Sequence, residues 1–343
     1  MALTAADLQL ILRHTYGVAG KVLCVAPTGN DSTGDGLTWD TAFLTLHPLR
    51  TGGASAAGAN DLILIAQGTV AATLASVSTF TAGVRIKGQG VDVTTLTVAL
   101  SGIELAGLTI EDLTVSLSSV GGLLVTRDGT GVLRRVKTVG VSDGIFAFPP
   151  ASISLRCDDC DFTSAFDACV IDSGAVKIDF IRCRFLTLVP SGTHNLARTL
   201  VVDAAVTGRV RLFNCDLNAI NLDAGQNARG ILNAGACAIE VHQGGVYSTV
   251  VAGGGTAYDL ENTGSGSIFA DGSDVKTTSG SNISVIPKSS RMVDATAAGL
   301  AKFVTGDTGQ TTAAAGSVAK LAGAAAPTPR TITVNEHSTV SGG

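Results

Sequence analysis

The sequence is poor in aromatic residues and has no strong excess of charge of either sign. Only 4% of its 343 residues are aromatic, with one Trp and three Tyr. Sites that grip polysaccharides are rich in aromatic side chains, so a long carbohydrate-cleaving groove is hard to build from this composition. The net charge is −5 and no Lys/Arg run occurs, which argues against binding driven by nucleic-acid phosphates.

Long apolar runs are also missing. No stretch reaches the roughly 18 apolar residues that a membrane-spanning helix needs. The first residues, MALTAADLQLILRHTYG, lack the positive start and the small-residue cleavage site of a signal peptide. Instead, Thr4 and Asp7 have the spacing of a capping box ahead of an apolar run, which predicts a short N-terminal helix. We expect no insertion into a membrane.

The seven cysteines are too few and too scattered for a disulfide framework, and their number is odd. Cys157 and Cys160 bracket two aspartates, but zinc would need a second Cys or His pair at compatible spacing. The five histidines are scattered and offer no such pair. We therefore expect reduced, buried thiols in a protein that is assembled in a reducing cytoplasm, and no metal.

Small and β-branched residues, including 42 glycines, predict many short strands joined by tight turns. A spacing of apolar residues that begins at Leu155 supports one elongated repeat domain. Apolar residues occupy the first, third, sixth and eighth positions of each unit, which reads as two short strands separated by a two-residue corner. The units begin at residues 62, 84, 108, 131, 155, 178, 210, 239 and 268.

The intervals between these units are 22 to 24 residues up to residue 178 and 29 to 32 residues after it. A period of 22 to 24 residues predicts one turn of a parallel β-helix, and the longer intervals predict inserted loops at 186–200 and 218–230. Leucine-rich repeats share the length but need a fixed Asn and a regular leucine frame, which are absent. The predicted fold class is therefore all-β, a parallel β-helix.

Outward positions test this register, because equivalent residues of successive coils stack about 4.8 Å apart. Their charges alternate in sign from coil to coil, as opposite charges on neighbouring strands attract. The predicted structural charge ladder contains Arg134, Arg135, Asp158, Asp159, Asp161, Arg182 and Arg184. The same register aligns Cys160, Cys183 and Cys215 as one interior stack. A paired-carboxylate active site remains the alternative for the three aspartates.

The coil pattern resembles right-handed parallel β-helix proteins of the pectate-lyase-like superfamily. The preceding segment, CVAPTGNDSTGDGLTWDTAFLTL at 24–46, resembles a motif found at the start of such helices in phage tail proteins and bacterial surface proteins. The resemblance covers roughly residues 24–276. It implies the fold, and it suggests a virion or cell-surface protein.

The catalytic patterns of this superfamily are not matched. Polygalacturonases carry Asn-x-Asp, Asp-Asp, Gly-His-Gly and Arg-x-Lys in that order, whereas here Arg85-Ile86-Lys87 precedes Asp158-Asp159 and no Gly-His-Gly exists. The acidic calcium ligands with a nearby Arg base that pectate lyases need have no counterpart run. We therefore predict no catalytic residue, no cofactor and no metal.

Four regions are expected. Residues 1–20 form a helix that attaches the chain, 21–60 a cap with Trp39 and Phe43 as its apolar plug, 61–276 the β-helix, and 277–343 a segment for oligomerisation. That last segment is rich in Ala, Gly and Thr, and we expect it to pack between subunits of a homotrimer.

Polar residues of the two inserted loops are the predicted binding surface. They are Thr193, His194, Asn195, Arg198, Asp223, Gln226 and Asn227. The expected function is that of a non-enzymatic structural or receptor-binding protein of a phage virion, such as a tail fibre, tailspike-like or head-decoration subunit. Its partners would be other virion proteins and a host cell-surface polysaccharide. A polysaccharide-depolymerising tailspike and a bacterial surface adhesin are the alternatives.

Overall fold

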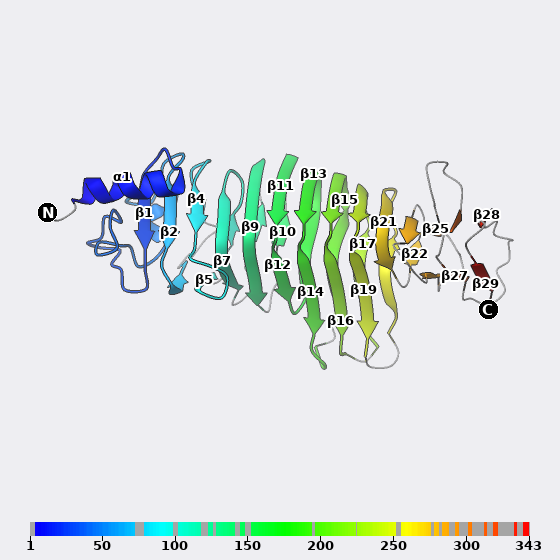
Figure 1. Cartoon of the computed structure of the whole chain (residues 1–343). Coiled ribbons are helices and arrows are strands. Elements are labelled where there is room, and N and C mark those ends of the chain that lie inside the picture. Colours follow the sequence, from blue (N-terminus) through cyan, green and yellow to red (C-terminus); the bar gives the residue numbers. More distant parts are fainter. Residues whose placement is uncertain are drawn as a thin grey trace. The chain divides into compact units, whose positions relative to one another are not determined.

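In the described part of the chain, the computed structural model has an N-terminal α-helix, a short 3-10 helix and parallel strands (Figure 1). It divides into two compact units, Met1–Phe162 and Thr163–Gly343, which are described separately. The described residues are 4–72, 79–98, 102–117, 123–125, 128–140, 145–147, 152–193, 196–223, 225–251, 255–275, 278–280, 283–287, 292–294, 301–303, 312–313, 318–321, 333–334 and 339–342.

The first unit contains the helix and the first coils. Its elements are α1 (Ala5–Tyr16), β1 (Val22–Val25), η1 (His47–Leu49), β2 (Leu62–Ile65), β3 (Gly68–Ala71), β4 (Arg85–Lys87), β5 (Thr94–Val98), β6 (Ile103–Glu104), β7 (Thr109–Leu117), β8 (Leu123–Val125), β9 (Gly129–Gly140), β10 (Ile145–Ala147), β11 (Ser152–Asp158) and β12 (Asp161–Ser164). Every strand pairing among the described residues of this unit is parallel, for example β1 with β2 and β7 with β9.

The coil register can be followed along one column of paired residues. It runs through Leu62, Arg85, Thr109, Val132 and Arg156. The predicted register from residue 84 onward is confirmed by these pairs. The first predicted unit is wrong by one residue, because Val84 aligns with Asp61 and not with Leu62. All four residues of β2 are buried, so this coil lacks the in-and-out alternation on which the prediction depends.

The two-residue corner of each coil has a fixed backbone conformation. Its second residue adopts a positive φ, between 50° at Arg135 and 58° at Gly272. This left-handed conformation turns the chain sharply between the two strands. The residues at this position are Asp112, Arg135, Asp159, Arg182, Asn214, Gln243 and Gly272. Their recurrence confirms the two-residue corner, and the fold is a right-handed parallel β-helix.

Helix α1 begins at the predicted capping box, in which Thr4 and Asp7 hydrogen-bond each other's backbone N–H. The side chain of Gln9 hydrogen-bonds both backbone polar groups of Val22 on the free edge of β1. Farther along that edge, Cys24 donates to Gly36 O and accepts from Phe43 N. These contacts satisfy an edge that would otherwise attract another strand.

The prediction that Trp39 and Phe43 together plug the cap is wrong for Trp39. Phe43 is 1% exposed, whereas Trp39 is 39% exposed. A Cβ atom at Gly36 would lie 2.4 Å from the Phe43 ring, so that ring packs directly against the glycine backbone. Of these two aromatic residues, Phe43 therefore lies in the interior, and the indole of Trp39 lies outside it.

The second unit continues with longer coils. Its elements are β13 (Asp167–Ile181), β14 (Arg184–Val189), β15 (Ala197–Phe213), β16 (Asp216–Asn221), β17 (Ala228–Asn233), β18 (Ala236–His242), β19 (Gly245–Val250), β20 (Ala257–Asn262), β21 (Ser267–Val275), β22 (Thr278–Gly280), β23 (Ile283–Pro287), β24 (Met292–Asp294), β25 (Ala301–Phe303), β26 (Thr312–Ala313), β27 (Val318–Leu321), β28 (Thr333–Val334) and β29 (Thr339–Gly342). Its predicted register is confirmed, since Ile178 pairs with Val210, Val210 with Ile239, and Ile239 with Ile268.

The prediction of inserted loops at 186–200 and 218–230 is wrong for most of these residues. Residues 186–189 and 218–221 extend strands β14 and β16, and residues 197–200 and 228–230 begin strands β15 and β17. β14 pairs in register with β16, and β16 with β19 (Figure 1). The buried residues Val189, Ala197, Ala219 and Ala228 form a small core between these strands and the first parts of β15 and β17. Alanine side chains let two strand layers approach closely. Because the segment is polar in composition, the sequence did not reveal these strands.

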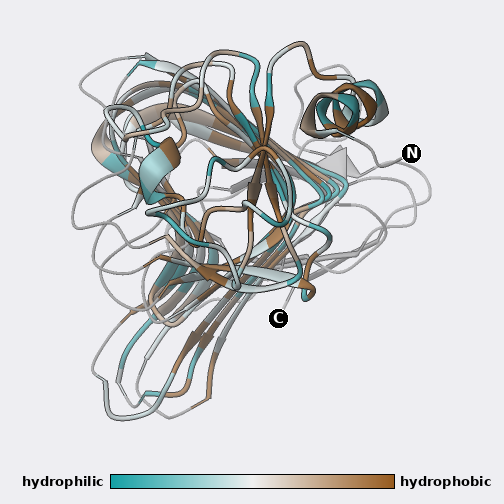
Figure 2. Cartoon of the chain, turned by 90° about the vertical axis from the view of Figure 1, so that its left-hand side faces the viewer, coloured by the Kyte–Doolittle hydropathy of each residue, from teal (hydrophilic) through white to brown (hydrophobic). Residues whose placement is uncertain are grey.

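The buried residues of both units are mainly apolar. In the first unit, α1 lies outside the coils (Figure 2). The largest fully buried residues include Phe162 in the first unit and Phe180 and Phe185 in the second. The predicted oligomerisation segment 277–343 falls mainly outside the described residues. Within it, β24, β27 and β29 pair in parallel, and so do β26 and β28.

Candidate functional site

Outward charges of the first unit are held by ion pairs between neighbouring coils. Glu111, which follows the buried Ile110 on β7, is the centre of this network and is 4% exposed. Its carboxylate lies 3.1 Å from Arg85 Nη2 on the preceding coil and 3.1 Å from Arg134 Nη1 on the following coil. Lys87 Nζ lies 3.7 Å away. A carboxylate surrounded in this way stabilises the stack and has no free face for a substrate.

Asp112 is the left-handed corner residue next to Glu111. Lys87 and Arg135, one coil on either side, form ion pairs with its carboxylate. Burial by itself would raise the pKa of Asp112, but the hydrogen bonds and positive charges of Arg135 and Lys87 lower it below its usual value. Asp112 is therefore ionised and structural.

The predicted ladder residues occupy the next coil in this unit. Asp158 accepts from Arg156 Nε at 2.9 Å, and Arg134 Nε lies 3.9 Å from it. Asp161 pairs in register with Lys137, whose ammonium group binds Asp92 at 2.7 Å. The Arg156–Asp158 pair lies within one strand and was not predicted. Asp159 is the left-handed corner residue of this coil.

The second unit shows the same arrangement. Arg211 donates two hydrogen bonds to Asp179 on the neighbouring strand, both at 2.7 Å, and these lower the pKa of Asp179. Its guanidinium also lies 5.5 Å from the centre of the Phe213 ring. Of the two remaining ladder residues, Arg182 is a left-handed corner and Arg184 pairs in register with Asp216.

The cysteines lie inside the coils. All seven are free and buried. Cys183 N–H donates to Cys215 Sγ at 3.4 Å, which places these two predicted stack members on adjacent coils, and Cys160 is 2% exposed in the first unit. Burial raises the pKa of Cys24 to about 12 and that of Cys237 to about 11. These thiols are poor nucleophiles and poor metal ligands at neutral pH.

Most of the predicted binding residues support their own strands. Asp223 accepts from Gly192 N–H at 3.0 Å and is 4% exposed. Asn227 accepts from Thr256 N–H through its side chain and from Ala197 N–H through its carbonyl. Their hydrogen bonds join adjacent coils, so these two side chains do not form an open polar surface.

The other predicted binding residues are distributed differently. Thr193 is exposed, and its hydroxyl donates to Pro190 O at 2.9 Å. Gln226 is half-buried. His194 and Asn195 lie outside the described residues. Arg198 alone of this set belongs to a cluster of ionisable groups.

Arg198 lies beside three carboxyl groups on β13 and β15. It forms a two-bond ion pair with Asp167, at 2.9 and 2.6 Å. The register of β13 and β15 then shifts by one residue, between the Ile171–Val202 and Ser173–Ala205 pairs. This bulge places Asp172 opposite Asp203 on the neighbouring strand. Burial and the Asp172 carboxyl raise the pKa of Asp203, while burial raises that of Asp167.

Two carboxylates that face each other repel, so we infer from the raised pKa of Asp203 that the pair holds one shared proton. The Asp172–Asp203 pair therefore differs from every ladder carboxylate described above. Sequence reasoning missed it because a constant 32-residue interval aligns Asp172 with Ala204. Only the bulge on β15 brings Asp203 into place.

The described residues contain no group of three or more His, Cys, Asp and Glu side chains arranged to hold a metal ion. Among them, no helix is long and apolar enough to cross a membrane.

No protein-family model matches the chain, and no curated protein sequence matches it. Among solved structures, it is similar to pectate lyase Pel9A, with a TM-score of 0.43 and 12% identity over 95% of this chain and 80% of that one. It is also similar to the A-modules of the Azotobacter vinelandii mannuronan C-5 epimerases AlgE4 and AlgE6. Both have TM-scores of 0.30 and cover 82% of this chain, at 11% identity over 91% of AlgE4 and 10% identity over 89% of AlgE6.

Proposed function

We propose that the protein is a non-enzymatic, receptor-binding subunit of a phage virion, in which a rigid β-helix shaft carries an attachment surface to the host. A tail fibre, a tailspike-like protein and a head-decoration subunit are the roles that fit this proposal. In this proposal the protein is a homotrimer that contacts other virion proteins and binds a host cell-surface polysaccharide.

The observation that carries the non-enzymatic part is the use of the outward charges. Glu111 and Asp112 each contact cations from both neighbouring coils, and Asp179 contacts Arg211. Acid–base catalysis needs a titratable group with access to substrate and a pKa near the working pH. The lowered pKa values of Asp112 and Asp179 and their paired geometry fit a structural role.

The attachment function is tested with the purified full chain. Fluorescently labelled protein is mixed with a panel of bacterial strains and with their isolated capsule and lipopolysaccharide. Light scattering in the same buffer gives the mass of the particle. We expect saturable binding to one class of surface, the mass of a trimer, and no release of reducing ends or unsaturated sugars. Failure to bind any surface contradicts attachment, and release of sugar products contradicts the non-enzymatic assignment.

A polysaccharide-cleaving enzyme is the second candidate, and one observation favours it. Asp172 and Asp203 share a proton next to Arg198, and a carboxyl group with a raised pKa is the form that general acids take. Asp203→Asn keeps the size of the side chain and removes the titration. If sugar release is detected, its loss in this variant, with release retained in Asp179→Asn, would assign the reaction to the pair.

A further inference from the structure

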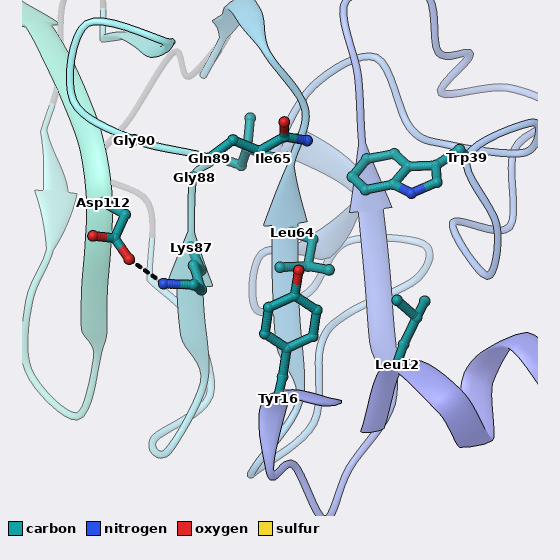
Figure 3. A pocket seen from close by; sticks show the side chains of 10 residues that line it. All are labelled: Leu12, Tyr16, Trp39, Leu64, Ile65, Lys87, Gly88, Gln89, Gly90 and Asp112. Atoms are coloured by element: carbon teal, nitrogen blue, oxygen red, sulfur yellow. Dashed lines mark hydrogen bonds and ion pairs between the residues drawn. The ribbon is translucent and has the colours of Figure 1, made fainter. Parts of the chain in front are cut away.

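A cleft in the first unit lies between α1, the segment that carries Trp39 and the first coils (Figure 3). Its volume is about 600 Å³, which is within the range of about 300–1,000 Å³ that is typical of small-ligand sites. The lining residues are Leu12, Tyr16, Trp39, Leu64, Ile65, Lys87, Gly88, Gln89, Gly90 and Asp112.

The helical wall of this cleft is fixed by polar contacts. Gln9 donates to both Val22 O and Leu37 O at 2.7 Å, which joins α1 to β1 and to the Trp39 segment. At the end of the helix, Arg85 Nη1 lies 3.4 Å from Tyr16 O. α1 has no buried residue, so these contacts, with the half-buried packing of Leu12 and Tyr16, hold it beside the coils. A fixed wall lowers the entropic cost of binding a ligand.

The cleft contains two of the four Trp and Tyr residues of the chain. Trp39 is the sole tryptophan, and with 39% of its surface exposed it is not used as core. Figure 3 shows Trp39 and Tyr16 on different sides of Leu64. An exposed indole face with an apolar floor is suited to the C–H face of a sugar ring.

The neutral polar groups in the cleft are available to a ligand. Among the described residues, the Tyr16 hydroxyl, the Trp39 indole N–H and the Gln89 side-chain amide make no hydrogen bond. Together they provide donors from all three groups and acceptors from Tyr16 and Gln89. Such a set matches vicinal hydroxyl groups, each of which both donates and accepts.

The charged groups in the lining cancel one another. Lys87 and Asp112 are its only charged members, and they form an ion pair (Figure 3). Asp112 is bound by Arg135 as well. An anionic or cationic ligand would have to compete with this pair, whereas an uncharged ligand leaves it intact. The free groups and the charge balance both favour a neutral, hydroxyl-rich ring.

We propose that this cleft binds one hexose ring of a neutral glycan, with the ring against Trp39 and its hydroxyls bonded to Gln89 and Tyr16. The inference rests on the proposed attachment function and gives it a location and a ligand class. It puts the contact at the α1 end of the β-helix and not on the strands 184–230.

The single tryptophan makes the test specific to this site. The fluorescence of the full chain is titrated with neutral trisaccharides of glucose, galactose and mannose, and with trigalacturonate as the charged comparison. We expect a saturable change with at least one neutral sugar and binding at least 10-fold weaker for trigalacturonate. No saturable change with any neutral sugar, or equal binding of trigalacturonate, overturns the proposal.

Substitutions in the cleft then show whether the fluorescence change comes from sugar bound there or from an indirect effect on Trp39. Loss of one neutral hydrogen bond weakens binding about 5-fold, so Gln89→Ala and Tyr16→Phe should each raise the dissociation constant by at least that factor. Tyr258→Phe, a tyrosine on β20 outside the cleft, is the matched control and should leave it unchanged. Equal constants for Gln89→Ala, Tyr16→Phe and the unmodified protein overturn the assignment, provided that circular dichroism shows the same fold.

Failure of the cleft proposal can be distinguished from failure of the attachment function. A protein that binds bacterial surfaces while Trp39 fluorescence stays constant has its receptor site elsewhere, and only the cleft assignment is lost. A protein that binds no bacterial surface contradicts attachment itself, whatever the trisaccharides do.

Discussion

Two carboxyl sites on the outside of the coils differ in the direction in which the pKa of an aspartate is shifted. At the corner of β7, Asp112 lies between Lys87 and Arg135, and its pKa is lowered. At the bulge of β15, Asp203 lies against Asp172, and its pKa is raised. Stacking of coils creates both sites, and the difference is the charge of the residue that the register places opposite. In this β-helix, outward carboxylates are neutralised by cations where opposite charges alternate. Where the register shifts, at Asp203, the carboxyl group keeps its proton to higher pH.

The largest effect in this comparison should come from Glu111, which contacts three cations. Glu111→Ala leaves Arg85, Lys87 and Arg134 without this partner. Breaking a buried ion pair costs about 3–5 kcal/mol, but the arginines are partly exposed, so we expect a loss of about 2 kcal/mol in the free energy of unfolding. Urea unfolding measures it. Glu240→Gln, at a more exposed carboxylate, is the control, and an equal loss in both variants would contradict the special role of Glu111.

Asp112→Asn tests the same ladder through its pH dependence. Asparagine is compatible with the left-handed backbone at this corner, so the change removes mainly the charge. A lowered pKa means that the carboxylate stabilises the fold above its unfolded pKa of about 3.9 and loses this effect as the pH falls. We expect a loss of about 1 kcal/mol at pH 7 that disappears in acid. A loss that is independent of pH would mean that the charge is not the cause.

The effect of Asp203→Asn on stability at pH 7 should have the opposite sign to that of Asp112→Asn. A carboxyl whose pKa is raised in the folded protein favours folding only while it is protonated, and this benefit is lost as the pH rises through its folded pKa. Asparagine needs no proton to bond to Asp172. The variant should therefore be as stable as the parent in acid and more stable at pH 7, by less than about 1 kcal/mol because the site is partly exposed. Thermal unfolding at several pH values measures this, and destabilisation at pH 7 would refute the shared proton.

The smallest effect is expected at the CDDC sequence itself. Asp158→Ala removes contacts with Arg156 and Arg134, whose side chains are 56% and 47% exposed. Exposed pairs contribute little, so we expect about 0.5 kcal/mol and unchanged binding to bacterial surfaces. Loss of binding in a folded Asp158→Ala protein would show that this carboxylate has a function outside the ladder.

The repeat was readable from the sequence because the interior of a coil imposes a two-residue alternation. That alternation defines the register from residue 84 onward, and the charges between Arg134 and Asp216 follow it. It fails at Leu62–Ile65, where both faces of the strand are buried. The same alternation is weak in β16 and β17, where alanine and asparagine replace larger apolar residues, so the sequence predicts loops for these strand residues.

The candidate sites were less predictable than the fold. Asp172 and Asp203 meet through a single bulge, and no composition or spacing rule marks that residue. Trp39 belongs to a segment whose resemblance predicts a cap, yet Phe43 packs against Gly36 while the indole of Trp39 is 39% exposed. Both sites depend on three-dimensional placement, which a one-dimensional pattern does not contain.

The most direct test of the account is a side-chain carboxyl titration of the full chain by carbon-detected NMR, with aspartates assigned by single Asn substitutions. The account predicts that Asp112 and Asp179 titrate below the ordinary aspartate value and that Asp203 titrates above it. If Asp203 titrates together with Asp112, the proton shared with Asp172 does not exist and the contrast between the ladder and the bulge is wrong.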